Sequence, residues 1–308
     1  DPMVRVEQID VAELPRLIAV RNIARPDDPA TVEGFLDWRR QAEDMVWLLA
    51  TSDGEDVGAG MGLVGWHSKP GSARVAAWTR PEARGRGVGL ALYTELLRWS
   101  AERGCVEVQT SVAEDDPDSL AWADRRGFRE VGRDLMVVLD LTTLDPPAID
   151  PPPGIEIVTW AERPELARGL YEVYVEADPD VPGQDEAEIP SIEEWLSDDM
   201  GGSSDRADAV FVALAGHEVV GYAKLSLPHE FTGTAWHDLT GVKRTWRGRG
   251  IASALKRAQI AWAKEQGFER LQTVNEERNA PIRHLNERYG YRPQPGRIVL
   301  STNISGID

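Results

Sequence analysis

The sequence contains little cysteine, few basic residues and no long apolar run. Cys105 is the only cysteine among 308 residues, which excludes an intrachain disulfide and is typical of a reducing compartment. The 34 lysines and arginines are outnumbered by 52 aspartates and glutamates, so the net charge is −18. This balance argues against nucleic acids and membranes as partners, because both usually select basic surfaces. Since no apolar segment approaches membrane-spanning length and no leader pattern is present, we expect a cytoplasmic protein.

Glycine is present in two turns that each lead into a helical pattern. The second turn follows a strand ending at Val242 and consists of Arg247, Gly248, Arg249, Gly250, Ile251 and Ala252. The first consists of Arg84, Gly85, Arg86, Gly87, Val88 and Gly89. Glycine permits a tight turn with exposed N–H groups, and the free amides of a helix N-terminus favour anions. Each turn is therefore a candidate pyrophosphate site, and the alternative of a turn without a ligand stays open at this point.

The two turns belong to an internal repeat. At a constant offset of 163 residues Arg84 matches Arg247, and the match continues without a gap to Gly127 and Gly290. Roughly a third of the paired residues in this stretch are identical, which is typical of a duplicated domain. A proline-rich segment separates the copies. We predict an N-terminal domain over 1–146, a linker over 147–154 and a C-terminal domain over 155–308.

Apolar periodicity predicts one order of elements for both domains: a strand, two helices, three strands, a helix, a strand, a helix and final strands. In the first domain the final strands are expected at Phe128–Val131 and Leu135–Leu141. In the second, the helix after the glycine turn should bury one face, formed by Ile251, Ala254, Leu255, Ala258 and Trp262.

The second turn resembles the acetyl-coenzyme A signature of GNAT-type N-acetyltransferases, Arg/Gln-x-x-Gly-x-Gly/Ala, through Arg247, Gly250 and Ala252. The resemblance covers nearly the whole chain and is strongest over 73–132 and 236–292. It implies two tandem GNAT-type domains of mixed α/β (α+β) class, each with a mixed, mostly antiparallel sheet flanked by helices. It also implies acetyl-coenzyme A as cosubstrate and no metal. The tandem layout is similar to that of mycothiol synthase, whose active site lies in its second half.

In this family the acyl thioester lies in a wedge between two strands, here the strand ending at Val242 and the strand Arg270–Asn275. The resemblance implies that the backbone near Val242 polarises the thioester and that an acceptor amine attacks it directly. The protein must then orient both reactants, receive a proton from the amine and stabilise the oxyanion.

A base for this reaction must border the wedge. With a side-chain period of two, Asp238 should share a face with Trp236, Thr240 and Val242, and His237 should point away unless a bulge intervenes. We therefore favour Asp238 over His237, with Glu276 at the end of the neighbouring strand as a third candidate. A carboxylate could act if burial raises its pKa. Asp238 can equally be a structural strand residue that satisfies backbone groups.

Other family features are present only in part. Asn275 and Asn279 are implied to bring amide groups to the pantetheine arm, although Asn279 can also cap a helix. The tyrosine that protonates the leaving thiolate in many members is absent from both halves, where Asn286 and Ala123 occupy its position. Tyr289, Tyr222 or water could replace it.

The two halves differ in candidate catalytic groups. At the constant offset Asp238, Asn275 and Asn279 are matched by Val75, Val112 and Asp116, so the second half is expected to be the catalyst. The acceptor should be a primary amine of a small molecule. Between residues 176 and 199 there are ten carboxylates and no basic residue, which could attract a cation or simply be solvated.

Two functions are compatible with these features. The first is an acetyl-coenzyme A-dependent N-acetyltransferase that works through a ternary complex in the second half. The alternative is a non-catalytic acyl-coenzyme A-binding or interaction protein with a degenerate tandem fold. Asp238 and the two asparagines favour the enzyme, and the missing tyrosine favours the alternative.

Overall fold

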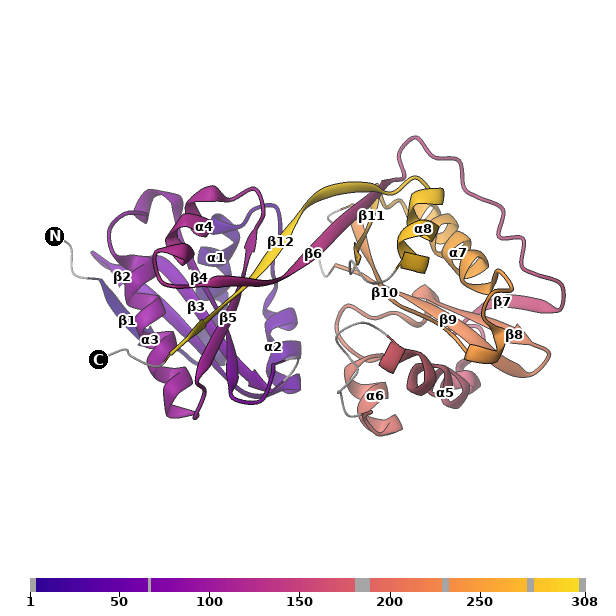
Figure 1. Cartoon of the computed structure of the whole chain (residues 1–308), viewed down its shortest axis with the longest axis horizontal. Coiled ribbons are helices and arrows are strands. Elements are labelled where there is room, and N and C mark those ends of the chain that lie inside the picture. Colours follow the sequence, from indigo (N-terminus) through magenta and orange to yellow (C-terminus); the bar gives the residue numbers. More distant parts are fainter. Residues whose placement is uncertain (1–3, 66–67, 181–188, 229–232, 276–279, 305–308) are drawn as a thin grey trace. The chain divides into compact units, whose positions relative to one another are not determined.

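The computed structural model describes residues 4–65, 68–180, 189–228, 233–275 and 280–304. The chain divides into two compact units, unit 1 with residues 1–133 and 297–308, and unit 2 with residues 134–296. Each unit has a sheet with helices on both faces (Figure 1). The predicted α/β class with a mixed, helix-flanked sheet is confirmed.

Unit 1 follows the predicted order of elements. It contains β1 (Arg5–Gln8), α1 (Leu14–Ala24), α2 (Val32–Gln41), β2 (Ala42–Ser52), β3 (Glu55–Gly65), β4 (Ser72–Thr79), α3 (Val88–Glu102), β5 (Glu107–Ala113) and α4 (Pro117–Asp124). The next strand, β6 (Arg129–Asp140), continues from unit 1 into unit 2. It is one strand, whereas the sequence predicted two, over 128–131 and 135–141.

Unit 2 repeats this plan. It contains β7 (Ile155–Thr159), α5 (Ala167–Ala177), α6 (Ile192–Asp198), β8 (Val210–Ala215), β9 (Glu218–Ser226), β10 (Thr234–Val242), α7 (Ile251–Glu265), β11 (Arg270–Asn275) and α8 (Ala280–Arg288). The last strand, β12 (Arg292–Asn303), leads back into unit 1.

The units exchange their last strands. Residues 297–303 of β12 pair antiparallel with β5 in unit 1, and residues 135–140 of β6 pair antiparallel with β11 in unit 2. The strand order is β1-β2-β3-β4-β5-β12 in unit 1 and β7-β8-β9-β10-β11-β6 in unit 2. The predicted domains, 1–146 and 155–308, follow the order of the chain, whereas each compact unit takes one strand from the other half of the sequence.

Each sheet is covered on both faces by apolar side chains. In unit 1, α3 buries Leu92, Leu96 and Trp99 on one face, while α1 and α2 bury residues such as Leu17 and Phe35 on the other. In unit 2 the corresponding clusters lie beneath α7 and beneath α5 with α6. The predicted apolar face of α7 is present, with Ile251, Ala254, Leu255 and Ala258 buried and Trp262 partly buried.

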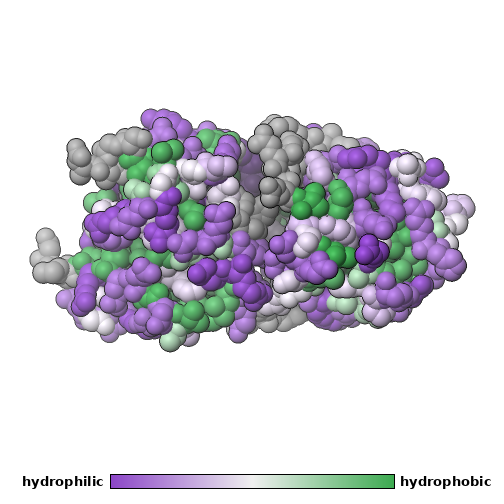
Figure 2. All heavy atoms as spheres, turned by 90° about the horizontal axis from the view of Figure 1, so that it is seen from below, coloured by the Kyte–Doolittle hydropathy of each residue, from purple (hydrophilic) through white to green (hydrophobic). Residues whose placement is uncertain are grey.

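The surface is largely hydrophilic on the face shown in Figure 2. Figure 2 shows extensive hydrophilic areas on one face, with hydrophobic residues confined to smaller areas. None of the described helices combines the length and the apolar composition needed to cross a membrane.

Candidate active site

Both units contain a wedge between two parallel strands. β4 and β5 pair over residues 72–74 and 107–109, and β10 and β11 pair over residues 234–236 and 270–272. Within the described residues each parallel ladder ends after these three pairs, so the strands separate toward Thr79 in unit 1 and toward Val242 in unit 2. The glycine turns and the helices α3 and α7 follow directly. This geometry brings the predicted turn and the predicted wedge together in both halves.

A β-bulge distinguishes the wedge of unit 2. The register of β10 against β9 shifts between His237, which lies opposite Leu225, and Thr240, which lies opposite Ala223. Three steps along β10 therefore match two along β9, which is the signature of one extra residue. In unit 1, β4 pairs with β3 without any shift from Arg74 to Thr79. The bulge therefore belongs to one half only.

The bulge shows that two predictions are wrong: which side chains of β10 share a face of the sheet, and which residues of β4 and β10 correspond in the two halves. Thr240 and Val242 lie on the α7 face together with His237, so the prediction that they share a face with Asp238 is wrong. For residues that precede the bulge, the constant offset of 163 residues also no longer relates equivalent positions of the two halves. The last parallel pairs are Arg74 with Gln109 and Trp236 with Gln272, which places β10 one residue out of step. Val75 therefore corresponds to His237, not to Asp238.

Asp238 lies at the bulge in a network of polar contacts. Its carboxylate accepts hydrogen bonds from the Ser226 hydroxyl at 2.9 Å and from the Leu239 N–H at 2.8 Å. The Lys224 ammonium lies 2.9 Å from it and also 2.9 Å from Asp205. The side chain of Asp238 is 41% exposed, whereas those of Lys224 and Asp205 are 7% and 6% exposed. Asp238 is thus the accessible member of a largely buried network.

The network keeps Asp238 ionised. Burial opposes the charge, but Lys224, the Ser226 hydroxyl and the Leu239 N–H outweigh it and lower the pKa of Asp238. The expectation that burial raises the pKa of this carboxyl does not match the direction found here. Asp238 is therefore a stable anion at neutral pH, suited to hold an ammonium group and less suited to remove a proton.

A second carboxylate on this side of the sheet titrates near neutrality. Desolvation raises the pKa of Asp199 to about 6, and the negative charges of Asp238 and Asp178 add to the shift, while Lys224 opposes it. The backbone carbonyl of Asp199 accepts a hydrogen bond from Lys224, which ties this residue to the Asp238 network. Asp199 ends the predicted acidic segment over 176–199, of which residues 181–188 lie outside the described residues.

His237 points to the opposite face, toward α7. Its Nε2 atom shares a hydrogen bond with the Tyr291 hydroxyl. The pKa of His237 is well below its usual value, mainly because burial disfavours the charged ring and also because Lys256 is close. His237 is therefore neutral at physiological pH. It is separated by the sheet from the Asp238 network, so the structure does not bring these two predicted catalytic residues together.

The two glycine turns have matching backbones. Gly85 and Gly87 adopt φ values of 75° and 83°, and Gly248 and Gly250 adopt 76° and 85°, a left-handed region that favours glycine. Gly87 and Gly250 are the N-terminal caps of α3 and α7. No side-chain cap occupies either helix N-terminus, so their backbone amides are free to bind an anion.

The surroundings of the second turn are more crowded. Arg247 donates to the Val242 carbonyl at 2.9 Å and forms an ion pair with Asp180 at 2.7 Å. A Cβ atom on Gly250 would meet Pro152 of the linker at 3.6 Å, whereas one on Gly87 would meet nothing within 4 Å.

The linker is also held at α7. Arg257 donates to the backbone carbonyls of Ile149 at 2.6 Å and Asp150 at 2.7 Å. Arg257 and Ser253 each bond to the Tyr289 hydroxyl, at 3.0 and 2.7 Å. Tyr289, one of the predicted substitutes for the missing proton donor, is thus engaged near the N-terminus of α7.

The first turn borders a pocket of about 660 Å³. Its lining includes Arg84, Gly85, Gly87, Val88 and Gly89 of the turn, with residues of β4, β5, α3 and α4. Arg86 is exposed and is not among the lining residues. Five arginines line the pocket, namely Arg25, Arg84, Arg125, Arg126 and Arg297, against the two carboxylates Asp116 and Asp118. In a strongly acidic chain this basic lining fits a phosphate-bearing ligand.

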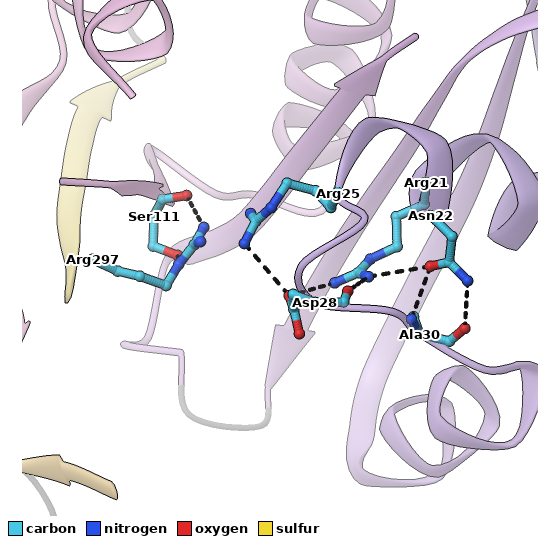
Figure 3. A network of polar contacts seen from close by, with 7 residues as sticks. All are labelled: Arg21, Asn22, Arg25, Asp28, Ala30, Ser111 and Arg297. Carbon is cyan, nitrogen blue, oxygen red and sulfur yellow. Dashed lines mark hydrogen bonds and ion pairs between the residues drawn. The ribbon is translucent and has the colours of Figure 1, made fainter. Parts of the chain in front are cut away.

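Two of these arginines are held in place by polar contacts (Figure 3). Arg297, from the exchanged strand β12, donates to the Ser111 hydroxyl at 2.9 Å and to the Ser111 carbonyl at 2.5 Å. Arg25 forms an ion pair with Asp28 at 3.5 Å, and Asp28 also pairs with Arg21 at 2.7 Å. The rim of the unit 1 pocket therefore depends on a residue from the far end of the chain.

The other predicted site residues have less definite positions. Glu276 and Asn279 lie outside the described residues, and Asn275 is the last residue of β11. Asn286 and Ala123, at the position of the missing tyrosine, are both buried. Among the described side chains, no three histidine, cysteine or carboxylate groups gather into a possible metal site.

Sequence reasoning missed Lys224, Asp205 and Lys256. A lysine inside an apolar strand or on the apolar face of a helix was a usable signal for two of them, because lysine is rarely buried without a role. Asp205 lies in a loop, where an aspartate is unremarkable in sequence.

The chain belongs to the acetyltransferase (GNAT) family, whose model matches residues 7–128 and 167–291. It is similar in structure to a tandem GNAT protein from the clavulanic acid biosynthesis pathway, with a TM-score of 0.79 and 20% identity over 99% of this chain and 100% of that chain. It is also similar to a GCN5-related N-acetyltransferase from Sphaerobacter thermophilus, with a TM-score of 0.73 and 22% identity over 99% and 97% of the chains. A putative acetyltransferase from Pyrococcus horikoshii gives a TM-score of 0.57 and 13% identity over 97% and 89%.

These comparisons confirm the predicted tandem GNAT architecture. Membership of the family supports acyl transfer in general, and the structural likenesses, all below 25% identity, establish the fold alone.

Proposed function

We propose that the chain is an acetyl-coenzyme A-dependent N-acetyltransferase whose active site lies in unit 2 and whose acceptor is a primary amine of a small molecule. The observation that carries the assignment to unit 2 is the β-bulge at Asp238, which unit 1 lacks. A bulge re-aims backbone and side chains beside a wedge, and bulges are frequent next to active sites. It also presents a half-exposed carboxylate on the face away from α7.

The donor would bind through backbone groups. The free amides at the N-terminus of α7, with Gly248 and Gly250 in left-handed conformations, suit a pyrophosphate. The pantetheine arm would follow the wedge between β10 and β11 toward the bulge. There the bulge leaves Asp238 and Leu239 outside the β-ladder, and because the Leu239 N–H donates to the Asp238 carboxylate, the Asp238 N–H would be the group available to the thioester oxygen.

The acceptor would approach from the α5 and α6 face. Asp238, kept ionised by Lys224, Ser226 and the Leu239 N–H, attracts a protonated amine. Asp199, with its pKa near 6, is better matched to receive the proton that the amine must lose before attack. The amine then attacks the thioester directly, and no covalent enzyme intermediate is needed.

Unit 1 would be a second acyl-coenzyme A site without turnover. Its 660 Å³ pocket combines the glycine turn with five arginines, but Val75 and Val112 replace the polar residues of unit 2. If both units bind the donor and neither transfers the acetyl group, the chain is a non-catalytic acyl-coenzyme A-binding protein, which is the second candidate function.

A matched pair of substitutions tests the proposal. Gly87→Glu and Gly250→Glu impose the same left-handed strain and bring a carboxylate to equivalent helix N-termini. We expect each to abolish acetyl-coenzyme A binding to its own unit, measured by calorimetry, and only Gly250→Glu to abolish thiol release with a panel of amines. Circular dichroism verifies that both variants fold. Loss of activity in Gly87→Glu alone would assign catalysis to unit 1, and no thiol release by the wild type with any amine would favour the binding protein.

A further inference from the structure

Four polar side chains meet beneath α7 in unit 2: His237, Lys256, Gln259 and Tyr291. The Tyr291 hydroxyl bonds to His237 Nε2, and the Lys256 ammonium lies 5.3 Å from the centre of the Tyr291 ring. Lys256, Gln259 and Tyr291 are 2%, 0% and 4% exposed. His237 Nδ1 and Gln259 Oε1 make no hydrogen bond of good geometry among the described residues, although the Gln259 side chain interacts with the His237 ring and opposes the lowering of its pKa. Side chains of these polar types are rarely gathered at such low exposure, so the cluster calls for an explanation in function.

The cluster occupies the position of the donor cleft. His237 directly follows Trp236, the last residue of β10 that pairs with β11, and so lies at the apex of the wedge. In unit 1 the four equivalent residues are Val75, Tyr93, Leu96 and Phe128, and all four line the 660 Å³ pocket. The same four positions are thus apolar or aromatic in the half without a bulge and polar in the half that has one.

Lys256 is unusual among the lysines of the chain. No carboxylate in the described ranges forms an ion pair with it, and the titratable groups that face it are His237 on β10 and Tyr291 just before β12. Its burial alone lowers the pKa of this lysine to about 7. Lys224 is almost as buried, but Asp205 and Asp238 raise its pKa instead. Lys256 therefore exchanges its proton near neutral pH, and Lys224 does not.

Acyl transfer needs a proton at the position where the thiolate leaves. The usual tyrosine is replaced by Asn286, and its counterpart in unit 1 is Ala123. Of the other candidates, Tyr289 bonds to Ser253 and Arg257, while Tyr222 lies on the opposite face of the sheet, in the cluster beneath α5. A thiol ionises near 8.5, so a donor with a pKa near 7 is well matched to protonate its anion.

We propose that Lys256 is the general acid that protonates the departing coenzyme A thiolate, an inference that rests on the proposed function of unit 2. As the acceptor nitrogen bonds to the acetyl carbon, the C–S bond breaks and sulfur keeps the electron pair. The Lys256 ammonium gives its proton to sulfur, and the amide nitrogen releases its own proton toward Asp199 or water. Lys256 regains a proton from solvent before the next turnover. The neutral His237 ring does not repel the ammonium, and the Tyr291 ring face stabilises it.

A change of leaving group tests this role. Acetyl-coenzyme A and its selenoester analogue have the same contacts, but a selenolate leaves without protonation because a selenol is a much stronger acid than a thiol. With hydroxylamine as the probe acceptor, Lys256→Gln should slow transfer from the thioester by roughly 10²-fold and transfer from the selenoester only a few-fold. Lys264→Gln, on the same helix, is the control and should change neither rate. Equal losses with both donors would show that Lys256 is structural and would overturn the proposal.

A second measurement does not need turnover. If Lys256 touches the sulfur, its positive charge should lower the pKa of the thiol of bound free coenzyme A, followed by thiolate absorbance during a pH titration. The Gly87→Glu protein confines the signal to unit 2. Lys256→Gln in that background should restore the ordinary thiol pKa. An unchanged thiol pKa overturns the proposal even if the enzyme is active, and a Lys256 found acetylated by peptide mass analysis overturns it as well, since the amine would then be a nucleophile. If the wild type releases no thiol but the pKa of the bound thiol still depends on Lys256, the proposed function is refuted, whereas the placement of Lys256 beside the sulfur is not.

Discussion

Replacing Lys224 with methionine should destabilise unit 2 strongly. The substitution keeps an apolar stem but removes an ammonium group that lies 2.9 Å from both Asp205 and Asp238. The Asp205 side chain is 6% exposed, and leaving such a charge unpaired costs about 3–5 kcal/mol. The Gly202 N–H still donates to Asp205 at 2.9 Å, which favours the lower end of this range. The Asp238 side chain is 41% exposed and can be hydrated once Lys224 is gone, so the loss of this second ion pair adds only about 0–1 kcal/mol to the destabilisation. The expected loss is about 3 kcal/mol at pH 7.

The measurement is the free energy of unfolding in urea, with Lys243→Met as control. Lys243 pairs at 3.1 Å with Glu218, whose side chain is 51% exposed, so its loss should cost only about 0–1 kcal/mol.

The effect should also depend on pH. Burial raises the pKa of Asp205 even beside Lys224, and removal of the lysine raises it further. A carboxyl whose folded pKa exceeds its unfolded value binds a proton more readily in the folded state as pH falls. The loss of stability caused by Lys224→Met should therefore be largest at pH 7 and become smaller toward pH 5. Two results would refute the assignment of Lys224 as the partner of a buried carboxylate. One is a loss in the free energy of unfolding below about 1 kcal/mol, equal to that of the control. The other is a loss that stays constant between pH 7 and pH 5.

Two further predictions follow from the site and the fold. Asp238→Asn should lower the rate of thiol release roughly 10²-fold with little change in acetyl-coenzyme A affinity, and it should move the acidic limb of the pH–rate profile to lower pH, because the Asp238 charge helps to raise the pKa of Asp199. A normal rate with an unmoved limb would exclude Asp238 from the reaction. Residues 1–146 produced alone lack the strand 297–303 that pairs with β5, so gel filtration should show self-association through that open edge. A monomeric fragment with native-like exchange protection in β5 would contradict this expectation.

The sequence predicted the features that depend on local chemistry. Glycines such as Gly87 and Gly250 are required by left-handed backbone at two equivalent turns, and their spacing revealed both the repeat and the family. The helix after each turn followed from its apolar period. Such signals are visible in a single stretch of chain because the residues that cause the structure are neighbours in sequence.

Features set by pairing between distant segments were not predictable in this way. The bulge at Asp238 is defined only by the register of β10 against β9, and no residue type within β10 announces it. The alternation rule then failed for Thr240 and Val242. The direction of the Asp238 pKa shift depended on Lys224, which comes from another strand. The exchange of β6 and β12 was likewise not predictable, because the strand that each one pairs with is not set by the residues within it.

The strand exchange has a consequence for the order in which the protein is made. Unit 1 is complete only when residues 297–303 reach β5, and these are synthesised after the whole of residues 134–296. At about 5–20 residues per second, the ribosome needs roughly 10–30 s for that interval. During this time the nascent first half exposes the unpaired edge of β5. The strand β6, which unit 2 needs, is synthesised before the rest of unit 2. The second half of the chain can therefore finish folding before the first, which reverses the usual N-to-C order of domain folding.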